Sequence, residues 1–334
     1  MIDKESGNRK TILRFKEKIR KLSNNNIHTY VVLGNHDLMY GSQFFRSFFE
    51  DDDKVYIFSD KRVEKIVHQK NGKKAVKIYG RGFWDADPYD NPTLPYLDEF
   101  DDEDDGMLTI AIAHGRVGEV NELLPCPSFP LNDLKKCNVH YWAMGHIHKR
   151  KVYIDELPLV VNPAGIQGVN IYELGPMGCY FSEWEGRQLK NIQFQSLEAI
   201  RWEKIIFCFD EKEEGDCFKS ISQVEKSIYK QLHTVYRKIN KPIIVQLILE
   251  GKTTLYGKLR NPHTLESIAK NVSDDYVLVA EIIDHTIPYI HFSKKSNLKI
   301  ILEQFASMID KLKKDASLYD RLEKEHRYLF SDPH

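Results

Sequence analysis

Histidine follows an apolar run at three places in this chain, each time where the run gives way to a short turn. These places are Gly34-Asn35-His36-Asp37, then His114, and then Gly145-His146-Ile147-His148. Neutral imidazole nitrogen is a common metal ligand in proteins, and an asparagine side chain adds a neutral oxygen donor. The residue types therefore indicate a candidate metal site where these turns meet, with one asparagine and four histidines available as ligands: Asn35, His36, His114, His146 and His148.

Two geometries are open for the pair His146 and His148. In an extended chain, side chains two residues apart project from the same side, which would aim both rings at one place. A turn after Gly145 would instead splay the rings toward two metals. Gly34 and Gly145 each permit a tight exit from a strand without a side chain that blocks the site.

The apolar runs before these turns predict the strands that must position the histidines. Such runs cover residues 28–33, 55–58, 75–79, 108–113 and 139–144, and a helix is predicted at residues 10–22 from its near-helical apolar spacing. This alternation predicts an α/β fold with a sheet buried between layers. Because sites on such sheets gather at the carboxyl ends of the strands, we expect the three turns to meet at one edge.

Composition narrows the classes of function. The 334 residues include 48 Lys and Arg and 49 Asp and Glu, a net charge of −1, so contact with DNA must come from a local patch. Five cysteines without a CxxC pair predict a reducing compartment. No apolar stretch reaches the roughly 18 residues of a spanning helix, and the first residues lack the apolar core of a signal peptide. We expect a soluble cytoplasmic protein without a membrane partner, whose acidic clusters at 50–53 and 98–105 are solvated loops.

The pattern of predicted elements changes near Trp202, from short alternating strands and turns to strands separated by long helical stretches. This change predicts two domains, residues 1–200 and 201–334. The second is predicted to hold strands at 204–209 and 243–250 and a helix within 211–239. A further helix is predicted at 295–327, with heptad-like apolar spacing at Leu298, Ile301, Phe305, Met308 and Leu312. It either packs on its own domain or docks a partner.

GNHD, a strand-end histidine and GHIH together resemble the signature of the calcineurin-like metallophosphoesterases. A narrower likeness, to SbcD/YhaO-type DNA repair exonucleases, rests on residues 162–168 (NPAGIQG), 173–180 (ELGPMGCY) and 199–202 (AIRW). The subgroup pattern is N-P-G-x-x-Q-G, and Ala164 is interpreted as an insertion before its glycine. The resemblance implies a mixed α/β (α+β) fold, a β-sandwich flanked by helices. It also implies a smaller C-terminal capping domain with a terminal helix.

The resemblance also implies a role for each site residue. Asn35, His114 and His146 would ligate one metal, and His148 would ligate the other. His36 would lie beside the scissile phosphate, stabilising charge or protonating the leaving oxygen, and Asp37 would orient His36. The implied reaction is in-line attack on a phosphodiester by a metal-activated water. Two divalent ions are expected, and because members of this family usually use Mn²⁺, the resemblance implies Mn²⁺. Nitrogen and oxygen donors also suit Fe or Zn.

Two further family motifs, D-x-H and GD-x-x-D, are expected upstream of GNHD, where they supply ligands and the carboxylate that bridges the metals. Neither motif is present, and the usual interval between GD-x-x-D and GNHD places Asp3 at the last position of GD-x-x-D. Two cations without a bridging charge repel strongly. The expectation is that Met1 is an internal methionine of a longer chain, and that this chain alone hydrolyses phosphodiesters poorly.

Three functions remain open. The first is a metal-dependent DNA nuclease that acts with an SMC-like coiled-coil ATPase, aided by C-terminal lysines at 294, 295, 299, 311, 313 and 314. The second is a catalytically incomplete scaffold that positions DNA or the ATPase, and the third is a general phosphatase or phosphodiesterase. A homodimer is compatible with all three. Outside the site, His140 is predicted to be a packed or edge residue, and Arg81 a solvated one that could alternatively reach a phosphate.

Overall fold

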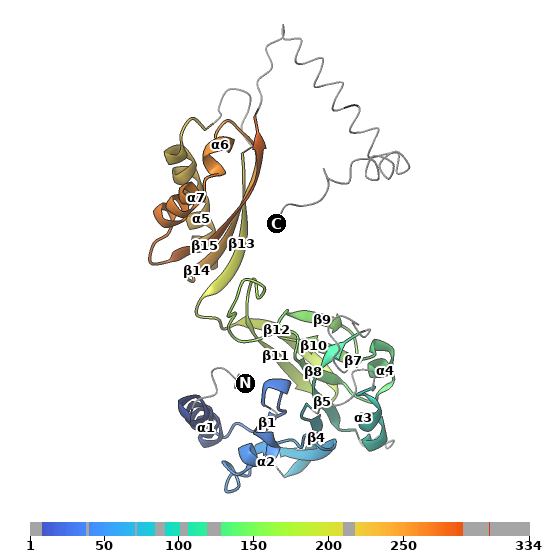
Figure 1. Cartoon of the computed structure of the whole chain (residues 1–334). Helices are drawn as coiled ribbons and strands as arrows, with labels where there is room; N and C mark the ends of the chain where they lie inside the picture. The colour runs from blue at the N-terminus through green and yellow to red at the C-terminus, as the bar shows by residue number, and fades with distance from the viewer. Residues whose placement is uncertain are drawn as a thin grey trace, which may run out of the picture. The chain divides into compact units, whose positions relative to one another are not determined.

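The computed structural model describes residues 9–37, 40–70, 72–83, 91–100, 106–118, 128–209, 218–289 and Ser307. The fold mixes helices and strands, as predicted (Figure 1). The backbone divides into two compact units. The first comprises residues 1–205, 231–246 and 273–281, and the second comprises 206–230, 247–272 and 282–334. The predicted boundary at residue 200 stays a prediction.

A six-stranded sheet forms the centre of the first unit, in the order β3-β4-β5-β8-β10-β9. Its strands are β3 (Glu64–Lys70), β4 (Lys73–Arg81), β5 (Leu108–His114), β8 (Tyr141–Gly145), β9 (Lys151–Ile154) and β10 (Leu159–Asn162). The inner strands β4, β5, β8 and β10 run parallel, whereas β3 and β9 are antiparallel to their neighbours. The strands predicted at 75–79, 108–113 and 139–144 are confirmed, and two of them carry the site histidines to one edge.

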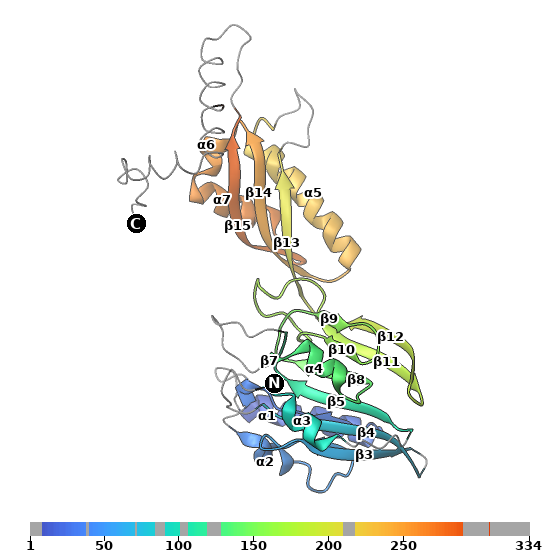
Figure 2. The ribbon, with the colours of Figure 1, turned by 90° about the vertical axis from the view of Figure 1, so that its right-hand side faces the viewer.

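Two short helices, α3 (Leu94–Glu99) and α4 (Leu131–Lys136), cover one face of this sheet (Figure 2). Tyr96 of α3 lies edge-on to Trp142 of β8, with ring centroids 5.3 Å apart, and both are fully buried with Leu134 and Phe129. Aromatic side chains of this size bury 150–250 Å² each. This cluster, which includes Phe129 of the short pair β6 (Arg116–Val117) and β7 (Ser128–Phe129), holds β5 and β8 in place.

A second cluster supports the GNHD turn. The short parallel strands β1 (Thr29–Val31) and β2 (Val55–Ile57) pack with α1 (Arg9–Asn24) and α2 (Gly41–Arg46). Phe15 of α1 contacts Phe45 of α2 edge-on, with ring centroids 5.7 Å apart. The acidic cluster 50–53 forms a turn, as predicted, but it also anchors α1, since Asp51 accepts a hydrogen bond from Arg20 at 2.8 Å.

The other acidic cluster, 98–105, departs from the solvated-loop prediction at its start. Asp98 and Glu99 close α3, because the helical turn from Leu94 places Tyr96 in the core. Residues 101–105 lie outside the described residues.

The hairpin β11 (Gly178–Glu185) and β12 (Gln188–Ser196) follows the main sheet, turning at Gly186, whose positive φ of 56° suits glycine. Trp184 of β11 contacts Tyr141 of β8, with ring centroids 6.3 Å apart.

The remaining elements comprise a sheet of order β13-β14-β15 and three helices. They are β13 (Arg201–Cys208), α5 (Ile221–Ile239), β14 (Ile243–Thr253), α6 (Tyr256–Leu259), α7 (Pro262–Val272) and β15 (Val277–Pro288). The strands predicted at 204–209 and 243–250 are confirmed, as is the helix within 211–239. The helix predicted at 295–327 lies outside the described residues except for Ser307, which is helical. In the described part of the chain, no helix has the length and apolar character needed to cross a membrane.

Candidate metal centre

His114, the last residue of β5, lies between the backbones of two glycines. A Cβ atom at Gly34 would stand 2.6 Å from Cε1 of His114, and one at Gly145 would stand 3.1 Å from its Nδ1. The first distance is shorter than any van der Waals contact allows, so the turn after β1 approaches His114 as only glycine can. The carboxyl ends of β5 and β8 and the GNHD turn therefore meet, as the sequence predicts.

The donor atoms of three predicted ligands gather around this meeting point. Oδ1 of Asn35 lies 3.0 Å from Nε2 of His114. The rings of His114 and His146 are 5.2 Å apart, at 77° to one another. Phe83 contacts both rings, stacking on His146 at 6.4 Å and standing edge-on to His114 at 6.0 Å. The structure thus brings Asn35, His114 and His146 together beside the ring of Phe83.

Burial keeps both of these histidines neutral. Burial, and then the charge of neighbouring His146, lowers the pKa of His114 to about 3. Burial, and then the charge of His148 and of Arg116, lowers the pKa of His146 as well. The charge of His36 acts on both residues in the same direction. Neutral imidazole, the form that binds metals, is therefore the form present at neutral pH.

The GNHD turn is closed by Asp37. Its carboxylate is 1% exposed and accepts a hydrogen bond from the N–H of Gly34 at 3.0 Å, while its own N–H donates to the Gly34 carbonyl at 3.0 Å. These bonds hold Asn35 and exposed His36 in one turn of 3₁₀ helix, η1 (Asn35–Asp37). Asp37 thereby fixes the backbone that presents His36, and the predicted contact with the His36 ring stays a prediction.

The GHIH segment adopts the second of its two predicted geometries. Strand β8 ends at Gly145, and His146 has a φ of 100°, an unusual value for a residue with a side chain. The alternation of an extended strand therefore does not apply to His146 and His148. Nδ1 of His148 lies 2.9 Å from the carboxylate of Glu173.

These donors fit part of a divalent-metal site. Asn35, His114 and His146 present one neutral oxygen and two neutral nitrogens, a set that suits Mn²⁺, Fe or Zn. Within the described ranges, no three His, Cys, Asp or Glu side chains form a group that could hold a metal ion. The residues present therefore fit the neutral part of such a site, and Asp3 lies outside the described residues.

Two other sequence predictions are resolved. Nδ1 of His140 accepts the N–H of Thr109 at 3.1 Å, which confirms a packed residue. Arg81 is only partly solvated: it ends β4 half-buried, its Nε lies 3.4 Å from the carbonyl of Asp60, and burial lowers its pKa. The prediction of a solvated loop residue missed this contact because the strand continues further than the apolar run 75–79.

Sequence reasoning missed Asn162 and Glu173 as parts of the site. Asn162, 1% exposed, donates from Nδ2 to the carbonyls of Ile147 at 2.6 Å and Lys149 at 3.3 Å, on either side of His148. Both residues belong to the motifs that carry the family likeness, but a motif does not disclose which side chain its members touch.

Ala164 replaces the motif glycine and is not an insertion, because the interval from Asn162 to Gln167 equals that of the pattern. Its φ of 67° is the left-handed conformation that favours glycine.

Replacing Ala164 with glycine is therefore expected to stabilise the protein. The left-handed conformation costs an alanine about 1–2 kcal/mol, and the greater freedom of unfolded glycine returns about 0.4–1 kcal/mol of that. A net gain of about 1 kcal/mol should be visible as a higher midpoint of urea unfolding. The matched change Ala269→Gly, within helix α7, should lower the free energy of unfolding by about 1 kcal/mol and so lower the midpoint. A lower midpoint for Ala164→Gly would contradict the conclusion that Ala164 occupies the position of the motif glycine.

Comparison with known proteins agrees with this geometry. Residues 1–150 match the family model of the calcineurin-like phosphoesterases. The chain is also 28% identical over 251 residues to the uncharacterized metallophosphoesterase YhaO of Bacillus subtilis (strain 168). That alignment covers 75% of this chain and 58% of the relative, so the chain spans a little over half the relative's length. Residues 1–150 are thus a calcineurin-like metallophosphoesterase domain.

Proposed function

We propose that this chain supplies the nuclease part of a DNA repair complex, in which it hydrolyses phosphodiesters with divalent cations beside an SMC-like ATPase. The family domain supports phosphoester hydrolysis. The observation that carries the proposal is the convergence of Asn35, His114 and His146 at the strand ends, with His148 in the adjoining turn. The finer parts of the proposal rest on the likeness to the exonuclease subgroup and on the charges described below.

Each residue has a part in the proposed reaction. Divalent cations, when bound, would activate water and neutralise charge on the phosphoryl oxygens. Asn35, His114 and His146 hold neutral donor atoms in place without any change of protonation. His36 is exposed on η1, where it can donate a proton to the leaving oxygen. Asp37 keeps that turn closed.

A basic run next to the site favours a polyanionic substrate. Lys149, Arg150 and Lys151 directly follow His148 and are all exposed. The Arg150 guanidinium lies 4.2 Å from the centre of the Phe194 ring, and the Lys151 ammonium lies 4.7 Å from that of Tyr153. Aromatic support of this kind orders long cationic side chains. Such ordered charges suit the repeated phosphates of DNA.

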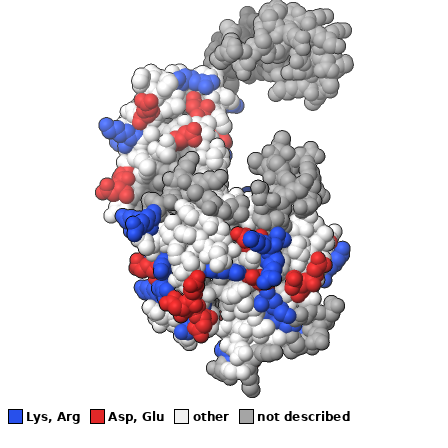
Figure 3. All heavy atoms as spheres, turned by 60° about the horizontal axis from the view of Figure 1, so that its bottom comes forward, with Lys and Arg blue, Asp and Glu red and all other residues white. Residues whose placement is uncertain are grey.

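Charges of both signs are mixed on the face of the molecule that Figure 3 draws. The face drawn in Figure 3 carries Lys and Arg close to Asp and Glu, in keeping with the net charge of −1. An unbroken run of three cations beside the site therefore has a local effect that the overall charge does not cancel.

The cofactor and partners are proposed on narrower grounds. Mn²⁺ is proposed because members of the family usually use it and because the neutral Asn and His donor atoms suit it. The ATPase partner is proposed from the subgroup likeness alone, since the proposed docking helix around 298–312 lies outside the described residues except for Ser307. A homodimer and a cytoplasmic location belong to the same proposal.

Reversing charge at Lys149 and Lys151 tests the choice of substrate. The double change to glutamate is expected to slow Mn²⁺-dependent degradation of linear DNA about 10-fold or more, and to reduce the salt slope of DNA binding by about 2. Hydrolysis of p-nitrophenyl phosphate, which has one phosphate and no backbone, should not change. The same reversal at Lys226 and Lys238, exposed on α5, serves as the control.

Other results would favour the alternatives. Hydrolysis of p-nitrophenyl phosphate in preference to DNA would favour a general phosphatase. DNA binding without hydrolysis under Mn²⁺, Fe²⁺ or Zn²⁺ would favour the scaffold.

A further inference from the structure

The imidazole of His148 is held by a buried carboxylate. The His148 side chain is 62% exposed, whereas the Glu173 side chain is only 9% exposed. Nδ1 of His148 and Oε1 of Glu173 are 2.9 Å apart. An ionised carboxylate can only accept hydrogen bonds, so this contact requires the proton of neutral His148 to be on Nδ1. Nε2 is then the nitrogen with a free lone pair.

Glu173 is itself fixed by its own loop. Its Oε2 accepts the N–H of Val169 at 3.0 Å, and its N–H donates to the Asn170 carbonyl at 3.1 Å. Nδ2 of Asn170 lies 3.3 Å from Oε1. A carboxylate bound on both oxygens does not rotate freely, so its direction toward His148 is set before any ligand arrives.

The backbone around His148 is held from the same loop. Asn162, at the end of β10, donates to the carbonyls of Ile147 and Lys149 and so brackets His148 in the chain. The motif residues Asn162 and Glu173 thus hold one histidine in two ways, the first by its backbone and the second by its ring.

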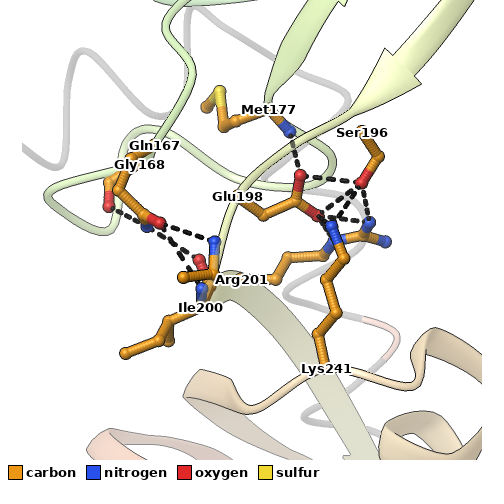
Figure 4. Close-up of polar contacts among 9 residues, drawn as sticks. Gln167, Gly168, Met177, Ser196, Glu198, Ile200, Arg201 and Lys241 are labelled. Carbon is orange, nitrogen blue, oxygen red and sulfur yellow. Dashed lines mark hydrogen bonds and ion pairs between the residues drawn. The ribbon is translucent and has the colours of Figure 1, made fainter. Parts of the chain in front are cut away.

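The loop from Asn162 to Met177 is in turn fastened to the segment before β13 (Figure 4). Gln167 accepts the N–H of Ala199 at 2.9 Å and donates to the carbonyl of Ile200 at 2.8 Å. Trp202 donates from Nε1 to the Gly168 carbonyl at 3.2 Å. These bonds join the three motif segments into one support.

We propose that Glu173 is a positioning residue that fixes the tautomer and direction of His148, so that Nε2 faces the metal. The role of His148 in binding a catalytic metal rests on the proposed function, whereas the His148 tautomer can be measured independently of that function. Nδ1–H donation to a carboxylate also raises the basicity of the opposite nitrogen, which strengthens a metal–imidazole bond.

Replacing Glu173 with glutamine tests this role, because an amide has one oxygen that accepts and one NH₂ group that donates, whereas both carboxylate oxygens accept. The backbone N–H of Val169 requires an acceptor, so the amide oxygen turns to it and the NH₂ group faces His148. The NH₂ group donates to Nδ1, and the proton of His148 moves to Nε2. Long-range ¹H–¹⁵N correlation spectra of the metal-free protein at pH 8 should show Nδ1–H in the wild type and Nε2–H in Glu173→Gln. The affinity for Mn²⁺ should fall about 10–100-fold.

A second variant separates positioning from loop stability. Gln167→Ala removes loop contacts to Ala199 and Ile200 that involve neither His148 nor Glu173, and it should lower the melting temperature without changing the His148 tautomer. The proposal is overturned if Glu173→Gln keeps Nδ1–H and its Mn²⁺ affinity, or if Gln167→Ala shifts the tautomer equally. If the tautomer inverts as expected but the wild type shows no metal-dependent DNA hydrolysis, the positioning role stands and the nuclease proposal fails.

Discussion

A Gly34→Ala protein is expected to fold and yet to lose Mn²⁺ affinity and metal-dependent hydrolysis by about 100-fold. The added Cβ would stand 2.6 Å from Cε1 and 2.9 Å from Nε2 of His114. The ring has little room to shift, because the Gly145 backbone is so near that a Cβ there would stand 3.1 Å from Nδ1, and because Ala113, its neighbour in β5, is buried. His114 would therefore turn away from Asn35, and the two donor atoms that now lie 3.0 Å apart would separate.

The matched control is Gly257→Ala in α6. A Cβ at that position meets no atom within 4 Å, so the variant should bind Mn²⁺ and unfold like the wild type. Isothermal titration with Mn²⁺ and thermal unfolding measure both properties. Undiminished Mn²⁺ binding by a folded Gly34→Ala protein would show that His114 is not a ligand.

The largest expected effect on stability comes from Glu198→Gln. The Glu198 carboxylate is buried and accepts hydrogen bonds from Met177 N–H at 3.1 Å, Ser196 Oγ at 2.7 Å and Arg201 Nε at 2.7 Å (Figure 4). The Lys241 ammonium lies 3.3 Å from it. A neutral amide of the same shape leaves both cations without their anion. Removing one partner of a buried ion pair typically costs about 3–5 kcal/mol.

Urea unfolding measures this loss, and Glu185→Gln is the comparison. Glu185 pairs with Lys190 at 2.8 Å on the surface, where both side chains are exposed. Exposed pairs contribute about 0–1 kcal/mol, so this change should be nearly silent. Equal losses for the two variants would refute the importance of the Glu198 cluster, as would no loss for Glu198→Gln.

The same cluster predicts a pH dependence. Burial alone would raise the pKa of Glu198, but hydrogen bonds from Ser196 and Arg201 prevail and lower it from 4.5 to about 2. Because the folded-state pKa is the lower one, the stabilisation is complete above pH 4.5 and is lost as pH falls toward about 2. The melting temperature of the wild type should fall through this window more steeply than that of Glu198→Gln.

Strands and strand-end residues could be predicted because they depend on local patterns. An apolar run that ends in Gly-Asn-His-Asp needs only its own sequence to indicate a strand and a turn. The meeting of His114 with Gly145 follows from the general rule for parallel sheets, since β5 and β8 pair in parallel. Gly34 also reaches His114, but it follows β1 of a separate two-stranded sheet, so the rule for a single sheet did not determine that contact.

The supports of the site could not be predicted, because they depend on contacts between distant residues. Glu173 reaches His148 across 25 residues, and Glu198 reaches Lys241 across the whole of α5. Neither pairing leaves a periodic trace in the sequence. The choice between extended and turned GHIH likewise depended on one backbone angle, at His146.

The most direct test of a divalent-metal centre at the strand ends is a Mn²⁺ titration of the wild type and His146→Ala, followed by the electron paramagnetic resonance signal of free Mn²⁺. We expect the wild type to remove Mn²⁺ from solution in a fixed ratio to protein. We also expect His146→Ala, with its fold intact, to lose at least about 10-fold in affinity. Equal binding by the two proteins, or no binding of Mn²⁺, Fe²⁺ or Zn²⁺ by the wild type, would contradict a metal centre at the strand ends.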